Sequence, residues 1–176
     1  MIDALWQMEE RMRTKYLMSV GLGIGLCAAQ LAQAVAADVP PVGVKAEIIA
    51  LAHKVVDAFN RGDMATVTAS MASGDQSILD EMPPFSWRGP QAVDTFLGDV
   101  AKDNERMGDT DGFSVLGPPI YIRVAGNHAY AAFPDRFSYK RRGAQIREDA
   151  RITFNAEKTP TGWRIVALAY TSGAHK

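Results

Sequence analysis

Cysteine is nearly absent from this sequence, in which Cys27 is the only one among 176 residues. It lies inside an apolar stretch near the N-terminus, directly after Leu26. Processing of a lipoprotein requires a small residue at that preceding position, so we expect no lipid anchor. Cleavage of this stretch as a leader would leave a chain without any thiol, which excludes disulfides and cysteine metal sites. Its stability must then come from the packing of its core.

Histidine is also scarce. His53, His128 and His175 are scattered along the chain, and none has the ligand spacing of a zinc or iron centre. The Ser-His-Asp order of a hydrolase, a nucleophile elbow and a phosphate-binding loop are missing as well. We therefore expect neither a bound metal nor a cofactor.

Neither sign of charge dominates. The chain has 19 basic and 20 acidic side chains and a formal net charge of −1. A nearly neutral balance gives no reason to expect nucleic acid or an anionic membrane as a partner. The one basic run, residues 140–142, is an expected turn without aromatic residues organised around it for base stacking. We expect no nucleic-acid partner.

A hydrophobic run long enough to span a membrane comfortably is missing too. The apolar run at residues 16–29 contains three glycines and falls short of the roughly 20 residues that a spanning helix needs. Basic residues precede it, and small residues with two A-x-A patterns follow it, which is the order of a secretory signal. This order favours a cleaved signal over the competing interpretation, a membrane anchor.

The leader is expected to cover residues 1–36, with cleavage near Ala34 or Ala36. Translation from Met12 would give a signal of normal shape, because the residues before it carry three acidic side chains that such a signal avoids. The predicted location is the periplasm or the medium, and no membrane anchor is expected after cleavage.

The rest of the chain is predicted to form one domain at residues 45–172, after a flexible lead-in at residues 37–44 and before a tail at residues 173–176. Apolar residues at spacings of three and four predict the first helix. Gly62 suits the left-handed position that ends it, and Asp63 can cap the next helix. The predicted helices cover residues 45–60, residues 64–71, and a third segment that begins near Pro90 and frays through residues 102–112.

Alternating, strand-like patterns dominate the second half of the chain, and short connections between them predict an antiparallel meander. Pro118 and Pro119 require the first of these strands to lie at an edge or to bend. Helices followed by strands indicate an α+β fold, a curved antiparallel sheet packed on about three N-terminal helices. The predicted strands cover residues 77–82 and 85–87, and then residues 113–124, 129–139, 144–155 and 163–171.

Three motifs follow one another along the chain: Phe59-Asn60-Arg61-Gly62-Asp63, then Ile78-Leu79-Asp80 with its prolines before Trp87-Arg88-Gly89, and Gly162-Trp163-Arg164-Ile165-Val166 before Tyr170. In this order they resemble the nuclear transport factor two superfamily, in its SnoaL-like and ketosteroid-isomerase-like branch. The likeness spans nearly all of residues 45–172. It implies a half-open cone whose sheet wraps around a pocket, in a family with isomerases, dehydratases and proteins that only bind.

Asp80 is the main catalytic candidate, because the resemblance places it where ketosteroid isomerases have their general base. A carboxylate in an apolar pocket loses hydration, so its pKa rises and it becomes suited to move a proton from carbon. The alternative interpretation is an exposed aspartate at a strand end that caps the turn at Pro83.

The donors that stabilise the enolate in such enzymes are not matched. The position of the family's tyrosine falls at Val55, and that of its late-strand acid falls near Ala150. Strand alternation places Glu148 on the face of Ala150, so Glu148 is a candidate interior acid. Tyr130 is the third catalytic candidate, as a donor from the neighbouring strand; it shares a face with His128, which we interpret as a turn residue.

These residues predict a pocket for a small apolar or cyclic molecule, with isomerase-like or dehydratase-like proton transfer as one hypothesis. Whether the protein is an enzyme stays open at this point. The alternatives are a non-catalytic periplasmic binding module and an association domain, and the resemblance implies a homodimer through the sheet face. The predicted pocket residues are Val55, Phe59, Met82, Trp87, Phe96, Ile152 and Tyr170.

Overall fold

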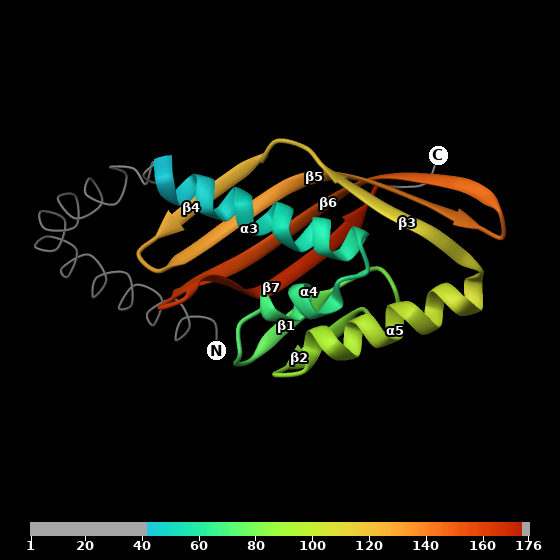
Figure 1. The fold of residues 1–176 in the computed structure, drawn as a ribbon, viewed down its shortest axis with the longest axis horizontal. Helices are drawn as coiled ribbons and strands as arrows, with labels where there is room; N and C mark the ends of the chain where they lie inside the picture. The colour runs from blue at the N-terminus through green and yellow to red at the C-terminus, as the bar shows by residue number, and fades with distance from the viewer. Residues whose placement is uncertain (1–41, 174–176) are drawn as a thin grey trace, which may run out of the picture. The chain divides into compact units, whose positions relative to one another are not determined.

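The computed structural model describes residues 42–173, shown in colour in Figure 1. The expected leader, its cleavage site and Cys27 lie outside the described residues. Within the described part of the chain, no helix is both long and apolar enough to cross a membrane.

The first helix, α3 (Val42–Asn60), begins three residues before the predicted start. Val44 packs against the hydrophobic core, so the apolar face of the helix extends into the segment that was expected to be a flexible lead-in. Its end is as predicted: Gly62 has φ of 70° and Asp63 accepts a hydrogen bond from the Thr66 amide at 3.1 Å. That cap starts the short helix α4 (Met64–Ala69).

The helix α5 (Ala92–Met107) continues through residues that were expected to fray. The prediction was wrong because the polar residues there stabilise the exposed side of the helix. Lys102 bonds Asp99 and Arg106 bonds Asp103, each three residues back. Gly108, with φ of 73°, then closes the helix in the left-handed conformation, and the next strand begins at once.

Seven strands form one curved sheet in the order β2-β1-β7-β6-β5-β3, with β4 also paired to β5. All neighbours are antiparallel except β1 and β7, which run parallel. This arrangement confirms the predicted α+β class. The strands are β1 (Gln76–Leu79), β2 (Ser86–Gly89), β3 (Asp109–Leu116), β4 (Tyr121–Ala125), β5 (His128–Arg141), β6 (Ala144–Thr159) and β7 (Gly162–Ser172).

The single strand expected at residues 113–124 is in fact two, β3 and β4, separated at Pro118 and Pro119. Proline has no amide to donate to a ladder, so pairing is interrupted there. The amides of Gly117 and Ile120 still donate to β5, at 2.9 and 2.8 Å, which keeps both pieces along the same edge.

The helix α3 crosses one face of the sheet, and α5 runs along the side that β1 and β2 form (Figure 1). We call the face toward α3 the inner face and the opposite one the outer face. The inner face carries Phe133, Phe154 and Ile165, each at most 2% exposed, and these side chains join those of α3 in one hydrophobic core. The space between this face and the helices is where the candidate site lies.

Candidate functional site

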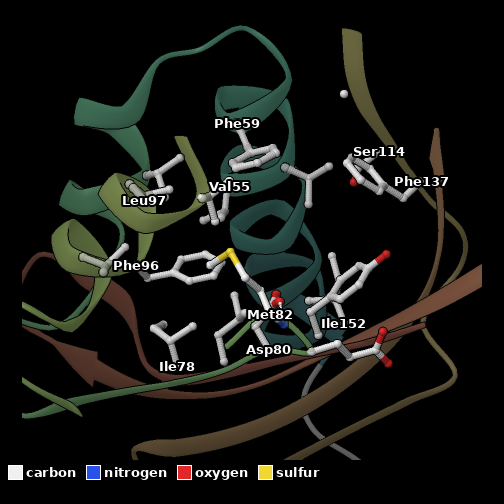
Figure 2. A pocket seen from close by; sticks show the side chains of 18 of the residues that line it. Val55, Phe59, Ile78, Asp80, Met82, Phe96, Leu97, Ser114, Phe137 and Ile152 are labelled. Carbon is white, nitrogen blue, oxygen red and sulfur yellow. Dashed lines mark hydrogen bonds between the residues drawn. The ribbon is translucent and has the colours of Figure 1, made fainter. Parts of the chain in front are cut away.

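A cavity of about 360 Å³ lies between α3, α5 and the inner face of the sheet (Figure 2). This volume falls in the range of small-molecule sites, roughly 300 to 1,000 Å³. Most of the wall is apolar. Of the seven pocket residues predicted from the sequence, six line the cavity: Val55, Phe59, Met82, Phe96, Ile152 and Tyr170.

Trp87 does not line the cavity, so its assignment as a pocket residue was wrong. It is 5% exposed and contacts the ring of Phe96 edge-on, with centroids 5.0 Å apart. Its indole Nε1 donates to Asp99 Oδ2 at 3.0 Å. Trp87 therefore packs behind Phe96, and Phe96 lines the cavity.

Asp80 lines the cavity at the end of β1, beside Met82 in Figure 2. Its Oδ1 accepts a hydrogen bond from the Met82 amide at 2.8 Å. Burial raises the pKa of Asp80, and the Met82 amide only partly offsets that effect; the negative charges of Glu81 and Glu148 raise it further. The side chain thus bonds within the turn before the prolines, as the alternative interpretation has it, but it is partly buried rather than exposed and it lines the cavity.

Glu148 also lines the cavity, on the inner face as predicted from strand alternation. It lies between two tyrosines from the neighbouring strands. Tyr139 of β5 donates to Oε1 at 2.9 Å, and Tyr170 of β7 donates to Oε2 at 3.2 Å. Burial first, and then the Glu148 carboxylate, raise the pKa of both tyrosines, so their hydroxyls keep their protons.

Tyr139 was missed from the sequence, and Tyr130 was chosen in its place. In β5 the odd-numbered residues from Phe133 to Tyr139 face inward, so Tyr130 lies on the outer face. It is 43% exposed and packs near Tyr121, with ring centroids 6.2 Å apart. A tyrosine there cannot donate into the cavity. His128 is on the same outer side, 3.6 Å from Glu157. The alternation of β5 was the signal that could have identified Tyr139.

Next to Tyr139, the cavity wall holds a second pair that sequence reasoning missed. Arg141 of β5 donates from Nε and Nη2 to the two carboxylate oxygens of Asp109, each at 2.8 Å. The guanidinium also lies over the ring of Tyr139, 5.3 Å from its centroid. Asp109 and Arg141 face each other at the start of β3 and the end of β5, so only the sheet register brings them together.

A buried carboxylate lies behind this wall. Asp135 of β5 is 2% exposed and accepts a hydrogen bond from Ser114 Oγ at 3.0 Å. Burial raises the pKa of Asp135, and the bond from Ser114 acts in the opposite direction. Asn60 at the end of α3 bonds both the amide and the carbonyl of Ser114, at 2.8 Å each, which ties the helix to β3.

Acidic groups outnumber basic ones on the cavity wall. Within residues 42–173, no group of three or more His, Cys, Asp or Glu side chains is arranged to hold a metal ion. The acidic lining residues are Asp80, Glu81, Asp103, Asp109 and Glu148, and the basic one is Arg141.

No protein-family model matches the chain, and no curated protein sequence matches it either. Solved structures do match. A nuclear transport factor two-like superfamily protein from Salmonella enterica serovar Typhimurium is 24% identical, with a TM-score of 0.63, over 76% of this chain and 94% of that one.

Two further similar structures have names that describe activities. A ketosteroid isomerase-like protein from Erwinia carotovora is 17% identical, with a TM-score of 0.58, over 74% of this chain and 96% of that one. A hexachlorocyclohexane dehydrochlorinase from Novosphingobium barchaimii is 12% identical, with a TM-score of 0.64, over 77% of this chain and 90% of that one. At these identities the likeness concerns the fold.

Proposed function

Because the chain has the nuclear transport factor two-like fold, we propose that it is an exported protein that binds a small apolar or cyclic molecule in its cavity and moves a proton to or from a carbon of that molecule. Asp80 is the general base. The observation that carries this proposal is the position of the Asp80 carboxylate on the wall of a largely apolar cavity. Fold alone does not define a reaction, so the argument rests on this site.

The environment of Asp80 suits proton transfer from carbon. A carboxylate that has lost hydration binds a proton more tightly, and burial raises the pKa of Asp80 in this way. The Met82 amide holds Oδ1 and so orients the carboxylate before substrate arrives. Two of the similar structures are named as a ketosteroid isomerase-like protein and a dehydrochlorinase, and both names concern reactions of cyclic molecules.

Deuterium exchange tests the proposal. β-Tetralone, a small cyclic ketone, is incubated with the protein in D₂O, and loss of its α-protons is followed by NMR. We expect the wild-type protein to accelerate exchange, and Asp80→Asn to reduce that acceleration by about a hundred-fold or more, as for loss of a general base. Asp75→Asn is the matched control, because Asp75 is exposed and does not line the cavity.

The outcomes separate the hypotheses. Equal exchange by wild type and Asp80→Asn would exclude Asp80 as the base. Absence of exchange, together with binding of the neutral dye N-phenylnaphthylamine that survives Asp80→Asn, would favour the non-catalytic binding module. Thermal denaturation of each variant establishes that it is folded.

Export is supported by the order of basic, apolar and small residues within residues 12–36. Expression of the full chain in a Gram-negative host should place it in the periplasm, with an N-terminus near Val35 or Ala37 by mass spectrometry. An intact leader on protein in the cytoplasm would contradict export.

A homodimer through the outer face is a second candidate function, favoured by apolar side chains on adjacent strands. Phe113, Val115, Tyr121 and Tyr130 are between 43% and 50% exposed there. Exposed apolar groups gathered on one face are typical of association surfaces. Sedimentation should show a dimer that Val115→Arg dissociates, with dye binding retained. A wild-type monomer at micromolar concentration would contradict this candidate.

A further inference from the structure

We propose that the ligand of this cavity is an organic cation, an apolar or cyclic molecule that carries one alkylated ammonium group, and that the ammonium binds at Glu148 within a cage of aromatic rings. This inference rests on the proposed function, because it assumes that the cavity binds a small molecule. It adds the charge of the ligand and the place where that charge lies.

The cage consists of three rings on the inner face, all of which line the cavity. Phe137 stacks near Tyr139, with centroids 5.4 Å apart at 29°, and meets Tyr170 edge-on at 6.3 Å and 80°. Phe137 is the residue opposite Glu148 in the β5–β6 register, and the hydroxyls of Tyr139 and Tyr170 bond the Glu148 carboxylate, so all three aromatic residues lie next to Glu148. Aromatic faces attract cations, and cages of such rings are a known means of binding alkylated ammonium groups.

The hydrogen bonds within the cage determine which polar groups face a ligand. Both tyrosine hydroxyls donate their protons to Glu148. A hydroxyl has one proton and two lone pairs, so each tyrosine oxygen presents electron density to the cavity. The raised pKa of each tyrosine keeps this arrangement at neutral pH. The polar groups of the cage are therefore complementary to a positive charge.

The charge of the wall favours the same class of ligand. Its carboxylates outnumber its one guanidinium, which both oxygens of Asp109 bind and which also lies over the ring of Tyr139 and near the charge of Glu148. The rings of Phe137 and Tyr170 are the part of the cage that remains for the ammonium group of a ligand. The negative charge of Glu148 also acts on Asp80 and raises its pKa. A cation near Glu148 would relieve that repulsion, whereas an anionic ligand would increase it.

The test uses three small probes that share a phenyl group. Benzyltrimethylammonium is the cation, neopentylbenzene is its uncharged carbon isostere, and phenylacetate is an anion. Each competes with N-phenylnaphthylamine, whose fluorescence rises when it enters an apolar cavity. We expect the cation to displace the dye at a concentration lower than that of its isostere by a factor of about ten.

Variants assign the preference to the cage. Glu148→Gln keeps an acceptor oxygen and removes the charge, so the cation should lose most of its advantage while the isostere binds as before. Asp149→Asn is the matched control, because it makes the same change at the next residue of β6, which is exposed. Phe137→Leu keeps apolar volume but removes a ring. We expect it to weaken binding of the cation several-fold more than binding of the isostere.

The outcomes distinguish this inference from the proposed function. If neopentylbenzene binds as tightly as the cation or more tightly, the inference of a cationic ligand is wrong, whereas the proposal of an apolar binding cavity still holds. Tightest binding by phenylacetate would overturn the inference in favour of a site at Arg141. A wild-type protein that binds neither the dye nor any probe would refute the proposed function itself. Thermal denaturation and isostere binding show that Glu148→Gln is folded.

Discussion

Replacing Val55 by phenylalanine tests whether the interior is hollow. Val55 lies on α3 and points into the cavity, as Figure 2 shows. In a close-packed core, extra carbon atoms force side chains and backbone to shift, which costs about 1–3 kcal/mol. Beside a cavity of about 360 Å³, the larger ring has room and buries apolar surface instead. The sign of the stability change therefore reports whether the space exists.

The magnitude follows from the added atoms. Phenylalanine has four more carbons than valine, and burial of each is worth about 0.8 kcal/mol, so the ceiling is about 3 kcal/mol. Loss of side-chain freedom reduces this gain. Valine and phenylalanine have similar helix propensities, so the backbone contributes little. We expect the free energy of unfolding of Val55→Phe to lie between that of wild type and about 2 kcal/mol above it.

Val124→Phe is the matched control. Val124 and Val55 are both 8% exposed, but Val124 lies in the core away from the cavity wall. The ring has no space there, so the control should lose about 1–3 kcal/mol even though aromatic residues are favoured in strands. For chains of this size each kcal/mol shifts the melting temperature by about 2–4 °C.

Two measurements complete the experiment. In thermal denaturation, the melting temperature of Val55→Phe should equal or exceed that of the wild type, and that of Val124→Phe should be lower. Titration with N-phenylnaphthylamine should show weaker binding to Val55→Phe, whose ring occupies the space, and unchanged binding to Val124→Phe. Equal destabilisation of both variants, with dye binding unaffected, would refute the hollow interior.

Two further predictions concern single contacts. Asp80→Asn should stabilise the protein at neutral pH, because burial raises the pKa of Asp80 in the folded state. The folded protein therefore favours the protonated side chain, and the stability of the wild type falls as pH rises through that raised pKa. The pH-dependent part of the stability difference between Asp80→Asn and wild type in urea denaturation should disappear by about pH 3, where the side chain is protonated in the folded and the unfolded state. A difference that still changes with pH below that point would contradict the linkage. Trp87→Phe should lower the free energy of unfolding by about 1–2 kcal/mol, because it removes the hydrogen bond to the Asp99 carboxylate but keeps an aromatic ring beside Phe96. Equilibrium denaturation measures this change, and an unchanged free energy of unfolding would show that the hydrogen bond contributes nothing.

The local features of the fold were predictable because short-range chemistry determines them. The apolar spacing of α3, the left-handed Gly62 and the capping Asp63 each depend on residues a few positions apart. The alternation of β6 likewise placed Glu148 and Ile152 on the inner face. For such features the sequence was sufficient.

Errors arose where distant residues decide the outcome. The polar end of α5 is an exception, because the ion pairs that stabilise it join residues only three positions apart. Pro118 and Pro119 indicated a bend, but only pairing with β5 shows that β3 and β4 share one edge.

The composition of the site depended most on tertiary structure. The pattern of the sequence established that an α+β domain with an acidic residue before two prolines is present. The alternation of β5 separates Tyr139 from Tyr130, but the register across three strands determines that Tyr139 and Tyr170 both reach Glu148. A shift of one residue in that register would exchange the two faces of a strand and separate these side chains. The cage around Glu148 and the wall formed by Phe96 in front of Trp87 exist only in the folded protein.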